Sequence, residues 1–141
     1  DEILISAHTK ELEKYGWKGG CSNVSAAYLV GLLAGLKAKK RNISSAILDI
    51  GLTVPVYGSK VFATLRGVVE AGLNVPHSDV VFPPNERVEG RHISEYASQL
   101  KTGDKDMYQQ RFSGYIKRGL NPEDLPNHFE TTKNNILKEL K

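Results

Sequence analysis

The stretch AILDIGLTVPVYGSKVFATLRGVVEAGLNVPH, residues 46–77, decides the predicted fold of this chain. Its first five residues, 46–50, form an apolar run with a single acid and predict a buried β-strand. A loop broken by glycine and proline follows at 51–58, and residues 59–72 predict an amphipathic helix. A helix N-terminus presents unpaired N–H groups and partial positive charge, so the start of this helix is a natural seat for phosphate.

The overall composition is that of an ordinary globular protein. The chain of 141 residues has the length of one domain with a sizeable core. Hydrophobic residues make up 40% and charged residues 25% of the sequence, which argues against a disordered chain. The formal net charge of +3 and the sequence pI of about 9.0 favour an anionic partner, although many nucleic-acid-binding proteins are more basic.

Cysteine usage and hydropathy exclude two classes of protein. A lone cysteine, Cys21, leaves no internal disulfide and no cysteine-rich zinc site. The longest apolar stretch, Ala26–Leu36, is too short to span a bilayer, and no targeting segment is recognisable. We therefore expect a reduced, cytoplasmic setting. Because the sequence starts at Asp1 rather than at a methionine, directly before the apolar residues Ile3–Ile5, we also expect that upstream residues are missing.

The rest of the first half adds a strand and two helices to this pattern. Ile3–Ala7 is short, apolar and partly β-branched, which predicts a strand. Thr9–Tyr15 predicts a brief helix. Val24–Lys40 predicts a long helix that begins after the N-cap residue Asn23 and carries apolar residues at spacings of three and four.

The order of these elements predicts an α/β fold. The strand Ser45–Ile50 is apolar on both sides, as in a central strand that helices cover on both faces. The missing side chains of Gly31 and Gly35 would let the long helix approach a sheet or another helix closely. Residues 1–80 would form this α/β core, and residues 81–141 a helical extension packed on the core or on a partner, not an independent domain. Three helices are expected in that extension: Arg91–Leu100, Asp104–Lys117 and Pro126–Leu140.

The loop that leads into the helix at 59–72 is the first candidate for contact with RNA. Gly58 lets the backbone approach a phosphate, and Ser59 and Lys60 supply donors. Tyr57 can stack on a base or hydrogen-bond to a ribose. The alternative is a plain helix cap followed by a solvated lysine, because glycine and serine commonly open a helix.

A second candidate lies near the start of the chain, where Trp17 stands between Lys14 and Lys18. An exposed tryptophan flanked by lysines suits stacking on a base or ribose. A tryptophan beside glycines can equally fill the edge of a core, and the sequence alone leaves both interpretations open.

Three patterns that suggest catalysis or metal binding lack the partners they need. Glu89-x-x-His92-x-x-Glu95 occurs once, whereas a carboxylate di-metal centre needs such a motif twice. Asp49, at the end of a predicted strand, has no evident second and third acid for a nuclease site. Cys21 likewise has no context for a nucleophile. We therefore expect no catalytic site, no metal and no cofactor.

Nine blocks of the sequence, in order, resemble the large-subunit ribosomal protein eighteen family in its archaeal and eukaryotic form. The main blocks are YGWKG (15–19), AAYL with GLLAGL (26–36), LDIGL (48–52), GSKVFA (58–63), EAGL (70–73), PH (76–77), GRHI (90–93) and RGLNP (118–122). Any one of these is weak, but their order and spacing together are specific.

The resemblance implies a three-layer α/β fold of the ribonuclease-H-like type, without nuclease activity. It also implies a structural constituent of the large ribosomal subunit that binds 5S rRNA and helps anchor it in the central protuberance. Large-subunit rRNA and neighbouring ribosomal proteins would be further partners. The family's basic N-terminal arm and first strands are absent before Asp1. The runner-up is a metal-dependent nuclease or phosphotransfer enzyme of the same fold. The residues expected at RNA are Lys14, Trp17, Lys18, Tyr57, Ser59, Lys60, Arg66, Arg91 and His92.

Overall fold

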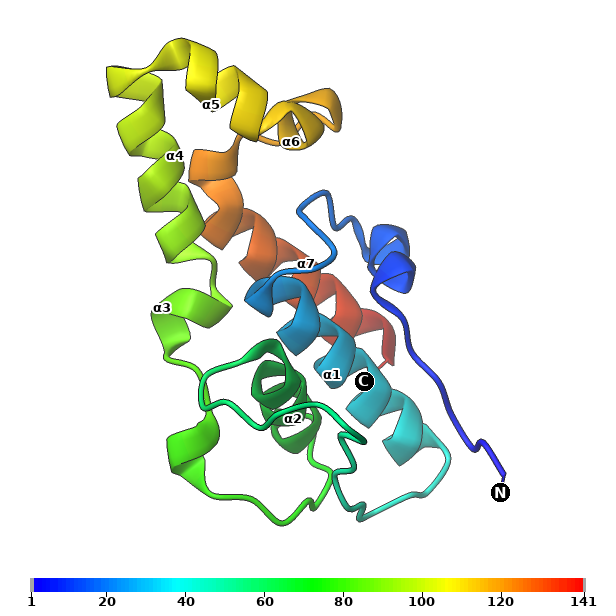
Figure 1. The fold of residues 1–141 in the computed structure, drawn as a ribbon. Coiled ribbons are helices and arrows are strands. Elements are labelled where there is room, and N and C mark those ends of the chain that lie inside the picture. Colours follow the sequence, from blue (N-terminus) through cyan, green and yellow to red (C-terminus); the bar gives the residue numbers. More distant parts are fainter. Residues whose placement is uncertain (1, 141) are drawn as a thin grey trace.

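The computed structural model describes residues 2–140, and its regular elements within this range are helices (Figure 1). In chain order they are the 3-10 helix η1 (Thr9–Tyr15), α1 (Val24–Lys40), α2 (Lys60–Glu70), the 3-10 helix η2 (Asp79–Val81), α3 (Asn85–Val88), α4 (Arg91–Gly103), α5 (Lys105–Arg111), α6 (Ser113–Lys117), the 3-10 helix η3 (Pro122–Asp124) and α7 (Leu125–Leu140).

The pair α1 and α2 forms the most intimate contact in the molecule. The Oδ1 atom of Asn23 accepts a hydrogen bond of 2.8 Å from the Ala26 N–H, which confirms the predicted N-cap of α1. A Cβ atom added at Gly31 would lie 2.0 Å from the Thr64 carbonyl oxygen. One added at Gly67 would lie 2.2 Å from the Tyr28 carbonyl oxygen. The two backbones therefore touch where side chains are missing, as predicted for Gly31.

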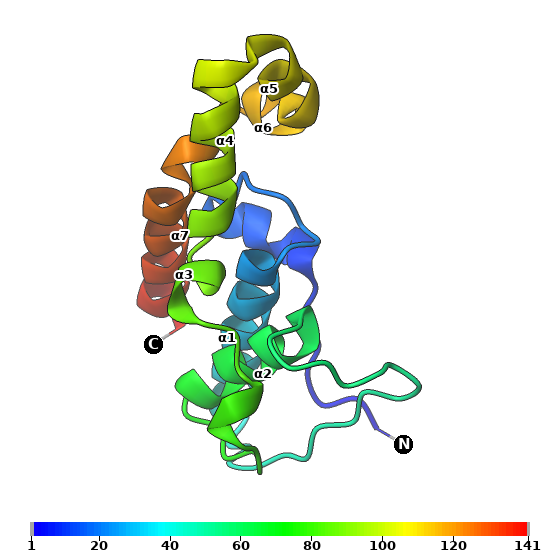
Figure 2. The same ribbon diagram turned by 60° about the vertical axis from the view of Figure 1, so that its left-hand side comes forward.

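The other side of α1 packs against η1 and α7. Leu12, Leu33 and Ile136 are fully buried in one hydrophobic cluster that joins these three elements. The rings of Tyr28 and Phe129 meet with their centroids 5.6 Å apart. Figures 1 and 2 show α7 running beside α1, so the main core contains residues from both halves of the sequence.

A smaller group of helices lies at the other end of the molecule. Both ribbon views place α5 and α6 beyond the end of α4, far from α2 (Figures 1 and 2). Ala97, Tyr108 and Phe112 form a separate hydrophobic cluster there. The Tyr108 hydroxyl donates a 2.7 Å hydrogen bond to Glu123, which also pairs with Lys101 at 2.9 Å. These contacts tie α4 and α5 to the turn that precedes α7.

The predicted three-layer α/β, ribonuclease-H-like fold is wrong for this structure. Neither Ile3–Ala7 nor Ser45–Ile50 forms a strand, and residues 2–140 contain no β-sheet. The only pairing of this kind in the described range is an isolated parallel bridge between Ser45 and Asn74.

The two predicted strands do not form because their backbone groups lack partners. A strand is stable in a core only where neighbouring strands take up its N–H and C=O groups. The Ala46 N–H donates to the Asn74 carbonyl at 3.0 Å as part of this bridge. Beyond it, residues 47–50 pair with no neighbouring strand in the described chain, and the left-handed Gly51 turns the chain away. The apolar side chains are consequently not covered: Ile47 is 87% exposed. Residues 3–7 instead run toward α1, where Lys37 Nζ donates to the Ser6 carbonyl.

The helix predictions are confirmed with small changes. The predicted helix at 104–117 divides at Phe112 into α5 and α6, and α4 continues three residues further than expected, to Gly103. The predicted helix 126–140 begins one residue earlier, at Leu125. None of the helices in residues 2–140 has the length and hydropathy needed to cross a membrane.

Candidate nucleic-acid interface

An open pocket of about 370 Å³ lies where two helices begin. Its walls come from the start of α1 (residues 22–24), the start of α2 (residues 58–60), Arg87 of α3 and His92 of α4. Three of the sequence-predicted residues, Ser59, Lys60 and His92, therefore meet in one place although 32 positions separate the last two.

The backbone before α2 leaves the first turn of this helix without a side-chain cap. Gly58 adopts the left-handed conformation with φ of 76°, and its N–H donates to the Val81 carbonyl at 2.9 Å. Ser59 occupies the N-cap position, yet its side chain caps no N–H group of the helix. The Ser59 Oγ atom is buried and has no hydrogen-bond partner within residues 2–140. This start of α2 thus combines the partial positive charge of a helix N-terminus with first-turn N–H groups that the Ser59 side chain does not cap.

The side chains around this pocket are basic. Lys60 and Arg87 are exposed, and neither forms an ion pair within residues 2–140. His92 Nδ1 is buried and has no hydrogen-bond partner in the described part of the chain. Burial lowers the pKa of His92, and the positive charge of Arg87 lowers it further, while Glu95 acts in the opposite direction. No acidic residue lines the pocket itself.

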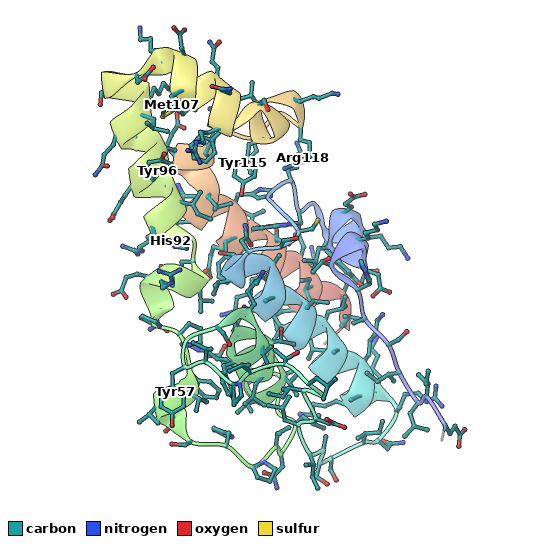
Figure 3. All side chains as sticks on the ribbon, in the orientation of Figure 1. Tyr57, His92, Tyr96, Met107, Tyr115 and Arg118 are labelled. Carbon is teal, nitrogen blue, oxygen red and sulfur yellow. The ribbon has the colours of Figure 1, made fainter. Side chains whose placement is uncertain are left out.

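Two other predicted residues lie beside this pocket. Figure 3 shows Tyr57 on the loop before α2 and His92 at the start of α4. The Tyr57 ring is 67% exposed and meets the edge of Phe62 at a centroid distance of 6.5 Å, so one face is open for stacking. Arg91 is exposed, and its Nε donates to Glu89 at 2.7 Å.

Arg66 is engaged within the protein. Its guanidinium donates to the Pro83 carbonyl at 2.9 Å and to the Asn85 side chain, and Glu70 lies 3.5 Å away. These bonds brace α2 against the segment that leads into α3. Arg66 therefore ties α2 to the start of α3, the helix that carries Arg87.

The loop after η1 holds the remaining predicted residues. Lys14 and Lys18 are exposed, whereas Trp17 is only 3% exposed. The Trp17 ring stacks on His128 at a centroid distance of 5.1 Å, and its Nε1 donates to the Gly20 carbonyl. Burial favours the core interpretation of the Trp17 ring over the stacking one that the sequence left open.

Trp17 also helps to fix the position of Lys18. The Lys18 N–H donates to His128 Nε2 at 2.8 Å, and Arg118 Nε donates to the Lys18 carbonyl at the same distance. Burial lowers the pKa of His128, and the Lys18 charge adds to this effect. The neutral imidazole is the form that accepts the Lys18 hydrogen bond, so the same environment that lowers the pKa preserves the contact.

Sequence reasoning missed three residues of this surface: Arg87, Tyr115 and Arg118. Arg118 lies over the Tyr115 ring at 5.5 Å, and Asn23 donates to the Tyr115 hydroxyl at 3.4 Å (Figure 3). Asn23 therefore links the pocket to the loop that carries Lys18. Arg118 stands in the family-like block RGLNP, which was a usable signal. Arg87 had none, because it joins Lys60 only through the packing of α3.

Comparisons with known proteins identify the family. The family model for "Ribosomal large subunit proteins 60S L5, and 50S L18" matches residues 36–78, which include the start of α2. The large ribosomal subunit protein uL18 of Methanothermobacter thermautotrophicus is 53% identical over 140 residues, 99% of this chain and 71% of the relative. This chain belongs to the uL18 family. It is thus a ribosomal protein of the large subunit, an RNA-binding part of this cytoplasmic ribonucleoprotein particle with a structural role in translation.

Proposed function

We propose that this uL18 family member binds 5S rRNA and helps to anchor it in the central protuberance of the large subunit. Its role is assembly without turnover: loops and helix ends neutralise phosphates, and the packed helices hold these groups in place. Large-subunit rRNA and neighbouring ribosomal proteins would complete the surroundings. The proposed RNA-contacting residues are Lys14, Lys18, Tyr57, Ser59, Lys60, Arg91 and His92, with Trp17 and Arg66 acting through the groups that they position.

The observation that carries this proposal is the 53% identity to uL18 over nearly the whole chain. Two structural features support it. The basic pocket at the start of α2 is lined by the exposed cations Lys60 and Arg87, and positive charge of this kind attracts RNA phosphates. The exposed ring of Tyr57 beside it offers a surface on which a base can stack.

No observation favours the runner-up, a metal-dependent nuclease or phosphotransfer enzyme. That hypothesis depended on a strand end that would present Asp49 beside other acids. In the structure Asp49 is exposed on an irregular segment, and its Oδ1 accepts the Gly51 N–H at 2.9 Å, which is a local turn contact.

The test is equilibrium binding of this chain to 5S rRNA, with transfer RNA as the competitor of similar charge, across a series of salt concentrations. Neutralisation of about five phosphates predicts a log–log slope of roughly −3.5 to −4.5. Tight, salt-dependent binding with preference for 5S rRNA is the expected result. Equal affinity for both RNAs at every salt concentration would contradict the proposal.

We also propose that residues 81–141 are a helical extension rather than a second domain. The hydrophobic cluster that Phe129 and Ile136 share with α1 supports this division, because α1 would lose its cover without them.

A further inference from the structure

The helical extension, residues 81–141, reaches back to the loop that carries Lys18 near the start of the chain. We propose that it positions Lys18 for RNA through two side chains, His128 of α7 and Arg118 directly after α6. This inference rests on the proposed function for the RNA contact of Lys18. It gives the extension a task in binding and makes His128 and Arg118 positioning residues for that contact.

Both backbone groups of Lys18 are bound by side chains that lie far along the sequence. Its N–H donates to His128 Nε2 at 2.8 Å, and its carbonyl accepts from Arg118 Nε at 2.8 Å. These partners are 110 and 100 positions away. Within the described residues no backbone group pairs with Lys18, so its own loop does not fix it. Together, His128 and Arg118 form the Lys18 clamp.

Packing holds the two side chains of the Lys18 clamp in place. The His128 ring stacks on the buried Trp17 ring with an angle of 23° between their planes. The Arg118 guanidinium lies over the Tyr115 ring (Figure 3). Side chains whose own conformations are fixed by packing can hold a third group within a narrow range of positions. The clamp therefore extends the rigidity of the packed helices to the loop.

The Lys18 clamp uses the backbone of Lys18 and leaves its ammonium group free. Lys18 is exposed and forms no ion pair in the part of the chain that the structure describes. A cation on a fixed backbone loses less conformational entropy on binding than a cation on a free loop. The arrangement therefore suits contact with an anionic chain such as the RNA backbone, and it lets the extension raise affinity without a contact of its own.

The charge state of His128 makes its contribution separable from that of a cation. Burial lowers the pKa of His128, and the positive charge of Lys18 lowers it further. The imidazole is therefore neutral at slightly alkaline pH, where it accepts the Lys18 N–H. Replacing it there removes a hydrogen bond and no positive charge.

The experiment is a double-mutant cycle of Lys18→Gln and His128→Leu, with 5S rRNA and transfer RNA binding measured across a salt series at slightly alkaline pH. His128→Gln is the matched control, because its amide oxygen can still accept the N–H. A second cycle pairs His128→Leu with Lys60→Gln, whose lysine lies at the start of α2. Nuclear magnetic resonance relaxation reports the order of the Lys18 amide in the free protein.

Loss of positioning should appear as weaker binding with an unchanged salt dependence. His128→Leu should lower the affinity for 5S rRNA about fivefold at an equal log–log slope, because the loop must be ordered on binding while the cations stay the same. In the Lys18→Gln background the same substitution should change affinity by less than about twofold, whereas its effect should persist beside Lys60→Gln. His128→Gln should bind within about twofold of wild type. The order parameter of the Lys18 amide should fall from about 0.85 to below about 0.6 in His128→Leu.

Two results would overturn the positioning role: a fivefold loss that persists in the Lys18→Gln background, or an unchanged order parameter of the Lys18 amide. Circular dichroism verifies that each variant is folded at the assay temperature. If His128→Leu is not, the order parameter is measured in Arg118→Gln, which changes an exposed side chain. Wild-type protein without preference for 5S rRNA would contradict the proposed function instead. The order parameter needs no RNA, so the two failures are distinguishable.

Discussion

Gly31→Ala is the substitution that most directly tests how α1 and α2 are packed. The added methyl group would lie 2.0 Å from the Thr64 carbonyl oxygen, with the carbonyl carbon at 2.8 Å. Carbon and oxygen atoms that are not bonded normally stay more than 3 Å apart, so α2 must move away along much of its length. No side-chain rotation relieves the contact, because both neighbouring atoms belong to the backbone.

The magnitude follows from two opposing terms. Overpacking of a tight interface costs roughly 1–3 kcal/mol, and a clash with backbone belongs at the upper end. Replacing glycine by alanine inside a helix returns about 1 kcal/mol of helix propensity. We therefore expect a net loss of about 2 kcal/mol in the free energy of unfolding. For a chain of this size that corresponds to a melting temperature about 7 °C lower.

Urea denaturation followed by circular dichroism measures this change. The matched control is Gly103→Ala at the end of α4, where an added Cβ meets no atom within 4 Å. The control should be neutral or slightly stabilising, because alanine reduces the freedom of the unfolded chain. If Gly31→Ala proved as stable as Gly103→Ala, the close approach of α1 and α2 would be refuted.

Three further predictions address other parts of the molecule. Ile47→Ser should change the free energy of unfolding by less than about 0.5 kcal/mol, because Ile47 is exposed, whereas Leu33→Ala should lower it by roughly 2–5 kcal/mol. Urea denaturation measures both, and a large loss of stability for Ile47→Ser would show that Ile47 is buried, as the predicted strand requires. The free energy of unfolding should decline as pH falls from 7.5 to 5, because burial lowers the pKa of His128 in the folded state below its unfolded value. His128→Gln should reduce the slope of the free energy of unfolding against pH. If this slope were unchanged, a neutral His128 that accepts the Lys18 N–H would be contradicted. A fragment of residues 1–80 should show no cooperative thermal transition, because it lacks the α7 side chains that cover α1; a sharp transition would make that half an independent domain.

The helices could be predicted because their information is local. An N-cap at Asn23, apolar spacing of three and four through α1, and a glycine after α2 are all visible within a few residues. The strands failed because the decisive information is not local. An apolar run such as Ser45–Ile50 reports that burial would be favourable, but whether a neighbouring strand accepts its backbone groups depends on the rest of the chain. In residues 2–140 only Asn74 offers such a pairing.

In the candidate site, too, residues with a local sequence signal were predicted and residues placed by packing were not. Ser59 and Lys60 were recognisable because a glycine, a hydroxyl and a lysine at a helix start are a local signal for phosphate. Arg87 was not recognised because only the packing of α3 brings it to the same pocket as Lys60, which no spacing in the sequence reveals. For Trp17 the sequence left an exposed, stacking ring and a buried, core-filling ring equally open, and only the structure, where the ring is buried against His128, favours the second.

The basic pocket at the start of α2 and the close contact between α1 and α2 are physically coupled. The pocket is assembled from the starts of α1 and α2, and the contacts of Gly31 on α1 and Gly67 on α2, about 10 Å further along each helix, set the relative position of the two helices. A rigid contact at that distance holds the two helix starts with little freedom, so the groups that line the pocket are arranged before RNA arrives. Preorganisation of this kind lowers the entropy that binding must overcome. The missing side chains that make α1 and α2 touch therefore serve the interface as well as the fold.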